Sequence, residues 1–387
     1  MSALKDRLTP DTLASFGREI DAIRDEVMAS RGSSDARYIK NIIRTQRILA
    51  VAGRAAIFTC LIFLPDAYVG IPSWPAFWVL IACGTASLGI AKILENMELG
   101  HNIMHGQWDW MRDPDIQSST WEWDNVCPAE QWKHSHNIVH HTWTNVIGKD
   151  NDIGYGVMRV FAEQKWHPYF LTQPLSNLMI ALFFEWGVAV HDLEVYKILL
   201  GKKSLRETMP LARQILRKVL PQVSKDYLVY PLLAGPFFMP VLAANIIANL
   251  IRNLWTYMII FCGHFPAGSN VFTAADVQGE TRAQWYLRQL LGSCNIRGGK
   301  LFHILSGNLS YQIEHHLFPD MPSNRYQEVS PRVRAVAARY GLPYNSGSLI
   351  RQFGTTQLRI LRQSWPSKPV NEDPGTTKPN HGLDAAS

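Results

Sequence analysis

The chain has 387 residues, 47% of them hydrophobic, which is enough for one large domain or two ordinary ones. Its 38 Lys and Arg residues outnumber its 32 Asp and Glu residues and give a net charge of +6, but they form no dense run with interleaved aromatic residues, so no nucleic-acid partner is expected. The five cysteines are odd in number and far apart, which argues against both a disulfide framework and a thiolate metal site.

The N-terminal region, residues 1–45, is predicted to contain a cytoplasmic amphipathic helix. Thr9 followed by Pro10 is typical of a helix start, because threonine caps a helix and proline fits its first turn. Apolar residues then recur every three or four positions, at Leu13, Phe16, Ile20, Ile23 and Val27. This helix should lie on the membrane surface or on the main body. The first twenty residues contain no apolar core of a cleavable signal peptide.

Two apolar stretches near the N-terminus predict a membrane hairpin. Residues 48–68 and 74–93 each approach the roughly 20 apolar residues that a spanning helix needs, with Arg54 and Lys92 as the charged exceptions. The loop between them contains Pro, Gly and aromatic residues but no Lys or Arg, which places it on the outer face, with Tyr68 and Trp74 at the interface.

A second hairpin is predicted within residues 227–264, with a turn at Gly235-Pro236 or Pro240. This places Arg252 at membrane depth, where an ionisable side chain is a hint of function. Nearly all remaining Lys and Arg residues lie outside the two hairpins, so both should begin and end in the cytoplasm. The predicted fold is an all-α integral membrane protein with four transmembrane helices in two hairpins and a cytoplasmic helical cap.

The rest of the chain completes this division. Residues 175–190 are apolar but short and contain Glu185, which favours an interfacial helix or a cavity wall over another span. The membrane domain is expected to cover residues 46–365. The tail, residues 366–387, is rich in Pro, Asn, Asp, Gly and Lys and is expected to be disordered.

Seven of the thirteen histidines form three clusters just outside the spans. His101 and His105 follow the second span, and their spacing places both imidazoles on one face of a helix, where they can hold one metal ion. An isolated pair of this kind is weak evidence. The other five are harder to explain by packing: His136, His140 and His141 within six residues, and His315 and His316 following Gln312.

His264 ends the second hairpin and should emerge on the same side as the three clusters. Together with the oxygen of Gln312, this set exceeds the four ligands of a structural zinc and the three of a catalytic one. Two metal ions are therefore implied. Imidazole ligands suit iron, copper, nickel or zinc, so the ligand type does not name the metal.

Three motifs in the chain resemble the histidine boxes of membrane fatty-acid desaturases: HNIMH, HNIVHHTWTN and YQIEHHLFP. The similarity extends over residues 10–365 and includes GKDNDIGYG after the second box. It is closest to the bacterial acyl, linoleoyl-CoA desaturase-like members, whose third box opens with Gln. The resemblance implies two iron ions that activate O2, bound by His101, His105, His136, His140, His141, His315 and His316, with His264 as an additional ligand and Gln312 as a weak one.

Ligating histidines normally donate their second N–H to an acceptor. Polar residues near the boxes are therefore candidates to orient the ligands: Glu98, Asn102, Asn137, Asn308 and Glu314. Each of them is equally well explained as an ordinary hydrogen-bonding residue.

The resemblance further implies a bacterial cytoplasmic-membrane enzyme with its active site on the cytoplasmic face. It would place a cis double bond in a fatty acyl chain carried by CoA, a carrier protein or a phospholipid. The chain contains HPYF at residue 167 rather than the HPGG motif of a fused cytochrome b5, so electrons should come from a separate ferredoxin, rubredoxin or flavin reductase.

Four alternatives remain open from the sequence. A membrane di-iron hydroxylase or alkane monooxygenase would use the same residues, and a catalytically inactive lipid-binding relative would keep the fold. A membrane zinc hydrolase needs only three histidines and no reductant. A soluble ferritin-like di-iron protein needs two Glu-x-x-His pairs, whereas only Glu98 and His101 form one at a box.

Overall fold

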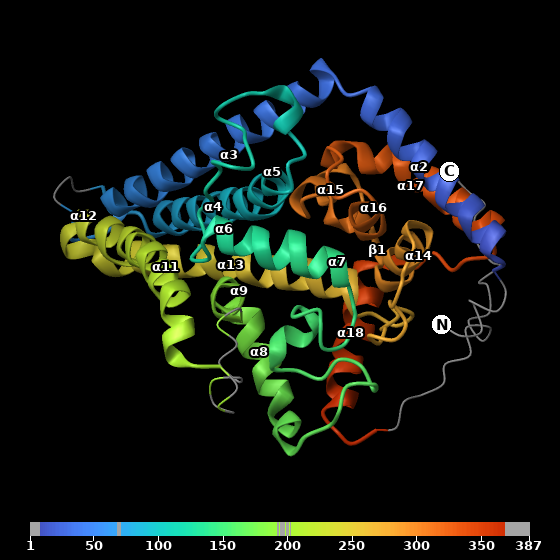
Figure 1. Cartoon of the computed structure of the whole chain (residues 1–387). Helices are drawn as coiled ribbons and strands as arrows, with labels where there is room; N and C mark the ends of the chain where they lie inside the picture. The colour runs from blue at the N-terminus through green and yellow to red at the C-terminus, as the bar shows by residue number, and fades with distance from the viewer. Residues whose placement is uncertain are drawn as a thin grey trace.

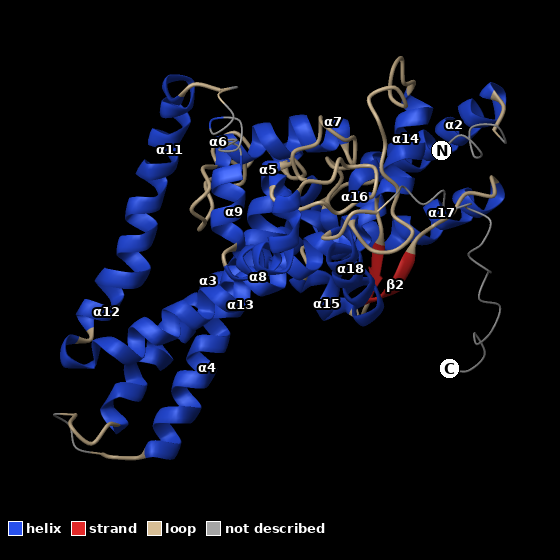
Figure 2. Ribbon diagram, turned by 90° about the horizontal axis from the view of Figure 1, so that it is seen from below, coloured by secondary structure: helices blue, strands red, loops and turns tan. Residues whose placement is uncertain are grey.

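In the computed structural model, long helices project to one side of a helical head (Figure 2). The structure describes residues 8–67, 71–191, 193, 198, 201 and 203–367. Most of the predicted tail and Tyr68 therefore lie outside the described residues. The head holds α14, α16, α17 and two short strands, while α3, α4, α12 and α13 extend away from it.

The N-terminal helix α2 (Pro10–Ala29) lies on the head. Thr9 caps it as predicted, because its Oγ1 accepts a hydrogen bond from the Thr12 N–H at 3.2 Å. Four of the predicted apolar residues are buried: Phe16, Ile20, Ile23 and Val27. They pack with α14 and α17, which Figure 1 shows beside α2. Of the two predicted locations, the structure therefore favours the protein body.

Three of the described helices are long and apolar enough to cross a membrane: Ser33–Phe63, Trp74–Met104 and Gly235–His264. The first comprises α3 (Ser33–Thr59) and a 3-10 turn, Cys60–Phe63. The second comprises α4 (Trp74–Ile93), a π-helical segment, Leu94–His101, and α5 (Asn102–Met104). The third comprises a 3-10 turn, Gly235–Phe237, and α13 (Phe238–His264). The first helix starts well before the predicted residue 48 and runs through the expected domain boundary at residue 45.

Close packing joins α3 to α4. A Cβ atom added to Gly53 would lie 2.9 Å from the carbonyl oxygen of Gly84, and one added to Gly84 would lie 2.9 Å from that of Gly53. Small residues at such positions allow the two backbones to approach. Because α4 also packs against α13, the three long helices form one unit.

The segment before α13 differs from the predicted span. α11 (Leu205–Ser224) continues through a π-helical segment, Lys225–Val229, into α12 (Tyr230–Leu233). We call residues 205–233 the helical arm. It is longer and more charged than expected and is not among the three apolar helices found in the described part of the chain. The predicted turn lies at Gly235, with a φ of 56°, whereas Pro240 lies inside α13.

Buried ion pairs fasten the helical arm to the long helices. Asp226 accepts hydrogen bonds from Lys92 Nζ at 2.8 Å and from Arg54 Nη2 at 3.1 Å. Lys92 also contacts Asp124 at 3.2 Å, and Arg54 donates to Asn245 Oδ1 at 2.6 Å. The two charged exceptions in the predicted first hairpin are therefore partners of one buried carboxylate.

The head is formed by short helices and turns. Strands β1 (Asn295–Arg297) and β2 (Ser346–Ser348) pair in parallel there, which is a small departure from the all-α prediction. The other described helices are α6 (Ala129–Trp132), a π-helical segment Lys133–His140, α7 (His141–Trp143), α8 (Gln173–Leu182), α9 (Phe184–His191), α14 (Arg282–Gly292), α15 (Lys300–Leu305), α16 (Gln312–Leu317), α17 (Tyr326–Arg339) and α18 (Leu349–Gln363). The remaining 3-10 turns are Asp109–Met111, Ile153–Gly156, Pro168–Thr172, Leu309–Tyr311 and Ser323–Arg325.

Removing the shared carboxylate should weaken the fold strongly. Asp226→Ala leaves Lys92 and Arg54 buried without their common partner, and we expect it to lower the free energy of unfolding by about 3–5 kcal/mol. Denaturation of the purified protein in detergent measures this. Glu26→Ala is the control, since its pair with Arg332 is exposed and should contribute about 1 kcal/mol or less. Equal losses of unfolding free energy in the two variants would contradict the role of Asp226 in joining the helical arm to the long helices.

Candidate metal centre

Elements far apart in the sequence deliver the predicted histidines to one buried cluster. His101 ends the π-helical segment after α4, and His136 and His140 lie on the π-helical segment after α6. His264 ends α13, and α16 carries the third box. A π-helix turns less per residue than an α-helix and is frequent at functional sites.

Four imidazoles form a first group that can hold a metal ion. Ligand atoms of His101, His105, His136 and His315 lie within 4.8 Å of one another. Nε2 of His101 and Nε2 of His315 are 3.2 Å apart. This spacing fits two nitrogen ligands of one ion, since metal–imidazole bonds are about 2.0–2.1 Å long.

A second group contains His140, His264 and His316, again with ligand atoms within 4.8 Å. The amide of Gln312 joins it, because its Nε2 is 2.9 Å from Nε2 of His264. Rotation of the amide by 180° would present the oxygen there instead. His141 lies between the two groups and can share an ion with His315 and His316.

Several imidazole nitrogens in the cluster are buried without a hydrogen-bond partner among the described residues. They are His105 Nε2, His136 Nε2, His140 Nε2, His141 Nδ1 and Nε2, His264 Nδ1 and His316 Nε2. Buried polar atoms normally have partners, and converging bare nitrogens are what a metal ion binds. The residues therefore fit two metal ions held mainly by imidazole.

Asp150 and Asp152 hold the second box from behind. Nδ1 of His140 is 3.0 Å from Asp150 Oδ1 and 3.5 Å from Asp152 Oδ2, and Nδ1 of His136 is 3.7 Å from Asp152. Asp150 is fixed in turn by the backbone N–H of Asn145, at 2.7 Å. Such carboxylates orient a ligating imidazole and make it more basic. Both carboxylates belong to the GKDNDIGYG motif after the second box, but the motif alone predicts no role for them.

The two carboxylates act to raise the pKa of both neighbouring histidines, but the net shifts of His136 and His140 have opposite signs. Burial lowers the pKa of His136 to about 4, although Asp152 partly opposes this shift. Burial also acts to lower the pKa of His140, but the charges of Asp150 and Asp152 outweigh it and raise that pKa above its ordinary value. A neutral imidazole is the form that binds a metal ion.

Other side chains orient the third box. Nδ1 of His316 is 3.0 Å from Gln289 Oε1 and 3.3 Å from Thr144 Oγ1, and Nδ1 of His315 is 3.3 Å from the Tyr326 hydroxyl. In each ring, the opposite nitrogen faces the cluster. Gln289 lies 27 residues before His316 and Tyr326 lies 11 residues after His315, and neither was predicted to contact a ligand.

The residues predicted to orient the ligands form hydrogen bonds elsewhere. Glu98 accepts from Tyr38, Ser323 and Asn308, and Glu314 accepts from Asn295 and Tyr344. The amide nitrogen of Asn102 donates to the carbonyls of Glu98 and Gly307, and that of Asn137 donates to the carbonyl of Met104. These contacts fasten the box helices to the head instead of contacting the imidazoles.

Two further side chains near the cluster were not predicted. His191 Nε2 lies 3.4 Å from Asp152 Oδ1, although its sequence position offers no ligand context. Trp132 stacks on His136, with ring centroids 4.4 Å apart. Its position four residues before His136 is the only signal in the sequence, and tryptophan is too common on helix faces for that signal to be specific.

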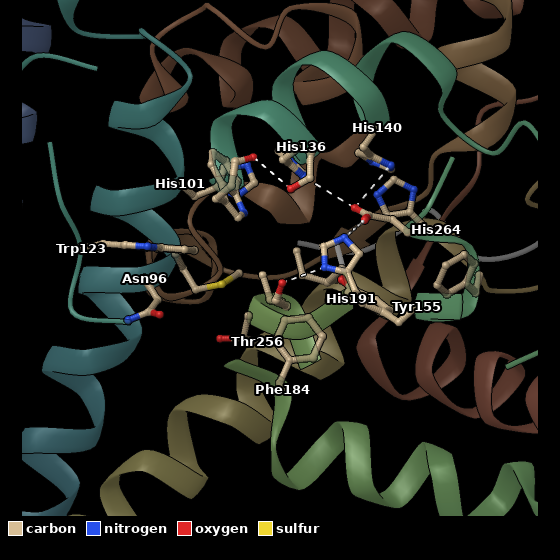
Figure 3. A pocket seen from close by; sticks show the side chains of 17 residues that line it. Asn96, His101, Trp123, His136, His140, Tyr155, Phe184, His191, Thr256 and His264 are labelled. Atoms are coloured by element: carbon tan, nitrogen blue, oxygen red, sulfur yellow. Dashed lines mark hydrogen bonds and ion pairs between the residues drawn. The ribbon is translucent and has the colours of Figure 1, made fainter. Parts of the chain in front are cut away.

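A cavity opens from the cluster between α9, α13 and the π-helical segment after α4 (Figure 3). His101, His136, His140, His264 and Asp152 line one end. Its other walls are mainly apolar or aromatic and include Met97, Trp123, Phe184, Val188, Ile260 and Phe265. The arrangement allows an apolar substrate to approach a metal centre away from water.

The fold and the site define a helical protein with membrane-length helices and an imidazole cluster suited to metal ions. The model of the family described as fatty acid desaturase matches residues 31–348. The chain therefore belongs to the fatty acid desaturase family, as the three histidine boxes indicated. It is an oxidoreductase that desaturates fatty acyl chains.

Similar proteins come from bacteria and eukaryotes. The NADPH-dependent stearoyl-CoA 9-desaturase of Mycobacterium tuberculosis is 45% identical over 370 residues, covering 95% of this chain and 83% of the relative. A fatty acid desaturase 2-like protein of Mus musculus is 27% identical, covering 61% of this chain and 46% of the relative. The acyl-lipid 8-desaturase of Rebecca salina is 29% identical, covering 57% and 48% respectively.

Asp150 should strengthen metal binding through His140. Asp150→Asn keeps the size of the side chain but removes its charge, and we expect it to weaken metal affinity by about 10–100-fold. Competition with a chelator measures the affinity. His134→Ala is the control, because His134 is exposed and outside the cluster. Unchanged affinity in Asp150→Asn would contradict this role.

The metal-free protein should lose stability on acidification. Burial lowers the pKa of His105, His136, His141, His315 and His316, so the unfolded chain takes up protons near its ordinary pKa of 6.5 while the folded chain does not. The unfolded state then binds more protons, and the free energy of unfolding falls as pH falls from about 6.5 towards the value of about 4 for His136. Outside the membrane-length helices, His140 with its raised pKa and Glu314, whose pKa burial raises to about 7, act in the opposite direction, but these two groups oppose five.

Denaturation of metal-free protein across that pH window tests this expectation. The metal-loaded protein is the comparison, because bound metal keeps the imidazoles neutral until protons displace it. A metal-free protein whose stability stayed constant or rose on acidification would contradict the expectation.

Proposed function

We propose that this protein introduces a cis double bond into a saturated acyl-CoA, with the new bond at or near carbon 9 of a stearoyl-type chain. The observation that carries the proposal is an apolar cavity that begins at the imidazole cluster. The name of the mycobacterial relative, a stearoyl-CoA 9-desaturase 45% identical to this chain, supports CoA as the carrier and carbon 9 as the position.

We further propose two iron ions, one for each imidazole group. His101, His105, His136 and His315 would hold the first, and His140, His264 and His316 the second, with Gln312 as a weak additional ligand. His141 would serve either ion from its position between the groups. When bound, the two irons supply the activation of O2. In the overall reaction the acyl chain loses two hydrogen atoms. One O2 takes up these two hydrogen atoms together with two electrons and two protons from the donor, and two water molecules form.

The chain's own residues position the substrate for this reaction. Met97, Phe184, Val188 and Ile260 would hold the methylenes by apolar contact and exclude water. Asp150 and Asp152 keep Nδ1 of the second-box imidazoles engaged, so that their Nε2 atoms face the cluster where the irons would be held. The position of the new double bond then depends on how far the acyl chain enters the cavity.

The proposed topology is four spans in two hairpins, in a bacterial cytoplasmic membrane with the head on the cytoplasmic face. The helical arm supplies the fourth span, since it leads to the turn at Gly235 and exposes Leu228, Leu232 and Leu233 near that end. Exposed apolar residues on the other long helices, such as Val51 and Val79, support contact with lipid.

Electrons would come from a separate donor protein. The mycobacterial relative is named as an NADPH-dependent enzyme, which supports a flavin reductase system ahead of a ferredoxin or rubredoxin. The net charge of +6 favours an acidic docking partner on the cytoplasmic side.

Expression with a donor system tests the proposed function. Membranes supplied with stearoyl-CoA, NADPH and O2 should yield a monounsaturated product by gas chromatography, and the purified protein should contain about two irons per chain, as in other di-iron proteins. His140→Ala and His315→Ala should abolish the product, whereas His134→Ala should retain it. A hydroxylated product would favour the monooxygenase alternative, and full activity with zinc alone would contradict redox chemistry.

A further inference from the structure

The cavity has a reactive end and a deep end. It follows the face of α13 that carries His264, Ile260 and Thr256, which recur every four residues. The rise of an α-helix places Thr256 about 12 Å from His264 along this axis. Figure 3 shows His101, His136, His140 and His264 at one side of the cavity and Thr256 with Phe184 at the other. The imidazoles thus form the reactive end and Thr256 with Phe184 the deep end.

A buried ion pair lies one helical turn beyond the deep end. Arg252 is four residues before Thr256 on the same face of α13, and it pairs with Glu185, the neighbour of Phe184 on α9. The two side chains are only 1% and 4% exposed. The carboxylate of Glu185 provides the charge that opposes the Arg252 guanidinium. Nη1 of Arg252 has no hydrogen-bond partner among the residues that the structure describes.

Asn253 holds this pair in place. Its Oδ1 accepts from Arg252 Nε at 3.1 Å, and its Nδ2 donates to the carbonyl of Leu182 at 2.8 Å. Leu182 ends α8, and the helix is interrupted there before α9 begins at Phe184. The pair is therefore fixed to the backbone that positions Phe184 in the cavity wall.

The cavity wall formed by the π-helical segment after α4 is also polar. Asn96 lines the cavity, and its amide is fully engaged: Nδ2 donates to the carbonyl of Lys92 at 3.0 Å, and Oδ1 accepts from Asn125 at 2.6 Å. Lys92, one turn deeper, is paired with Asp226. An acyl chain that passed Thr256 would therefore meet charged or fully hydrogen-bonded groups on both sides.

We propose that the Arg252–Glu185 pair is the closed end of the acyl cavity and limits the length of chain that the enzyme accepts. This inference rests on the proposed acyl-CoA desaturase function. A methyl end that reached the pair would have to separate two buried charges without replacing their interaction, which is unfavourable. Chains that end above the pair meet no such barrier.

Removing both charges should lengthen the cavity. In Glu185→Ala/Arg252→Ala neither charge is left unpaired, and the missing side chains add space directly below Thr256. We expect the ratio of arachidoyl-CoA to stearoyl-CoA turnover to rise by on the order of tenfold, a typical effect of methylene-sized changes in an apolar pocket. The double bond should stay at the same distance from the thioester, because the reactive end is unchanged.

Two further double variants control for the loss of a buried pair. Glu185→Arg/Arg252→Glu reverses the charges but keeps the pair, and it should retain the native chain-length ratio. Asp35→Ala/Arg325→Ala removes a buried pair between α3 and the turn at residues 323–325, away from the cavity lining. It should lower stability without changing the ratio.

A variant with the opposite effect covers the case in which the alanine double variant fails to fold. Thr256→Leu adds bulk at the deep end, so the ratio of palmitoyl-CoA to stearoyl-CoA turnover should rise. An unchanged ratio in a folded, iron-loaded alanine double variant, or in Thr256→Leu, would overturn the inference. Failure of the unaltered enzyme to desaturate any acyl-CoA would instead overturn the proposed function.

Discussion

The head of this protein depends on imidazole nitrogens that converge without protein partners. His105, His136, His140 and His316 each present a buried Nε2 with no hydrogen bond among the described residues. Leaving several such atoms unsatisfied is costly, whereas a metal ion satisfies them together. Because the ligands come from elements far apart in the chain, metal binding and folding of the head are coupled. The Nδ1 contacts of His140 and His316 with Asp150 and Gln289 fix the rings before an ion arrives.

A second constraint is the placement of charge among the long helices. Arg54 and Lys92 share Asp226, and Arg252 pairs with Glu185, so each buried cation meets a carboxylate from another element. An unpaired charge at such depth would be far more costly than the pair. The pairs of Asp226 join α3, α4 and the helical arm, and the pair of Arg252 joins α13 to α9. The arrangement explains why residues that weaken a hydropathy signal are retained in helices of spanning length.

The sequence predicted the repeating features and missed those that arise from tertiary contact. The α2 cap at Thr9, the Trp74 start of α4 and the turn at Gly235 follow local rules, and the structure contains all three. The helical arm was missed because Asp226 within it is neutralised by Arg54 and Lys92, which lie on helices distant in sequence. The π-helical segments were also missed, and one of them carries His136 and His140 into different imidazole groups.

The two ends of the candidate site differ in how clearly the sequence marks them. At the reactive end, the ligand pattern is dense enough to be read from sequence, because nothing in packing requires three histidines within six residues. At the deep end, no short motif marks Arg252 or Glu185; they meet only because α9 folds against α13. The imidazole cluster thus determines the reaction, whereas the contact between α9 and α13 determines the depth of the cavity. A substitution at the α9–α13 contact can change the space for the methyl end of the acyl chain while His101 and His264 remain in place. The length of acyl chain that the cavity accepts can therefore change without a change in the reaction.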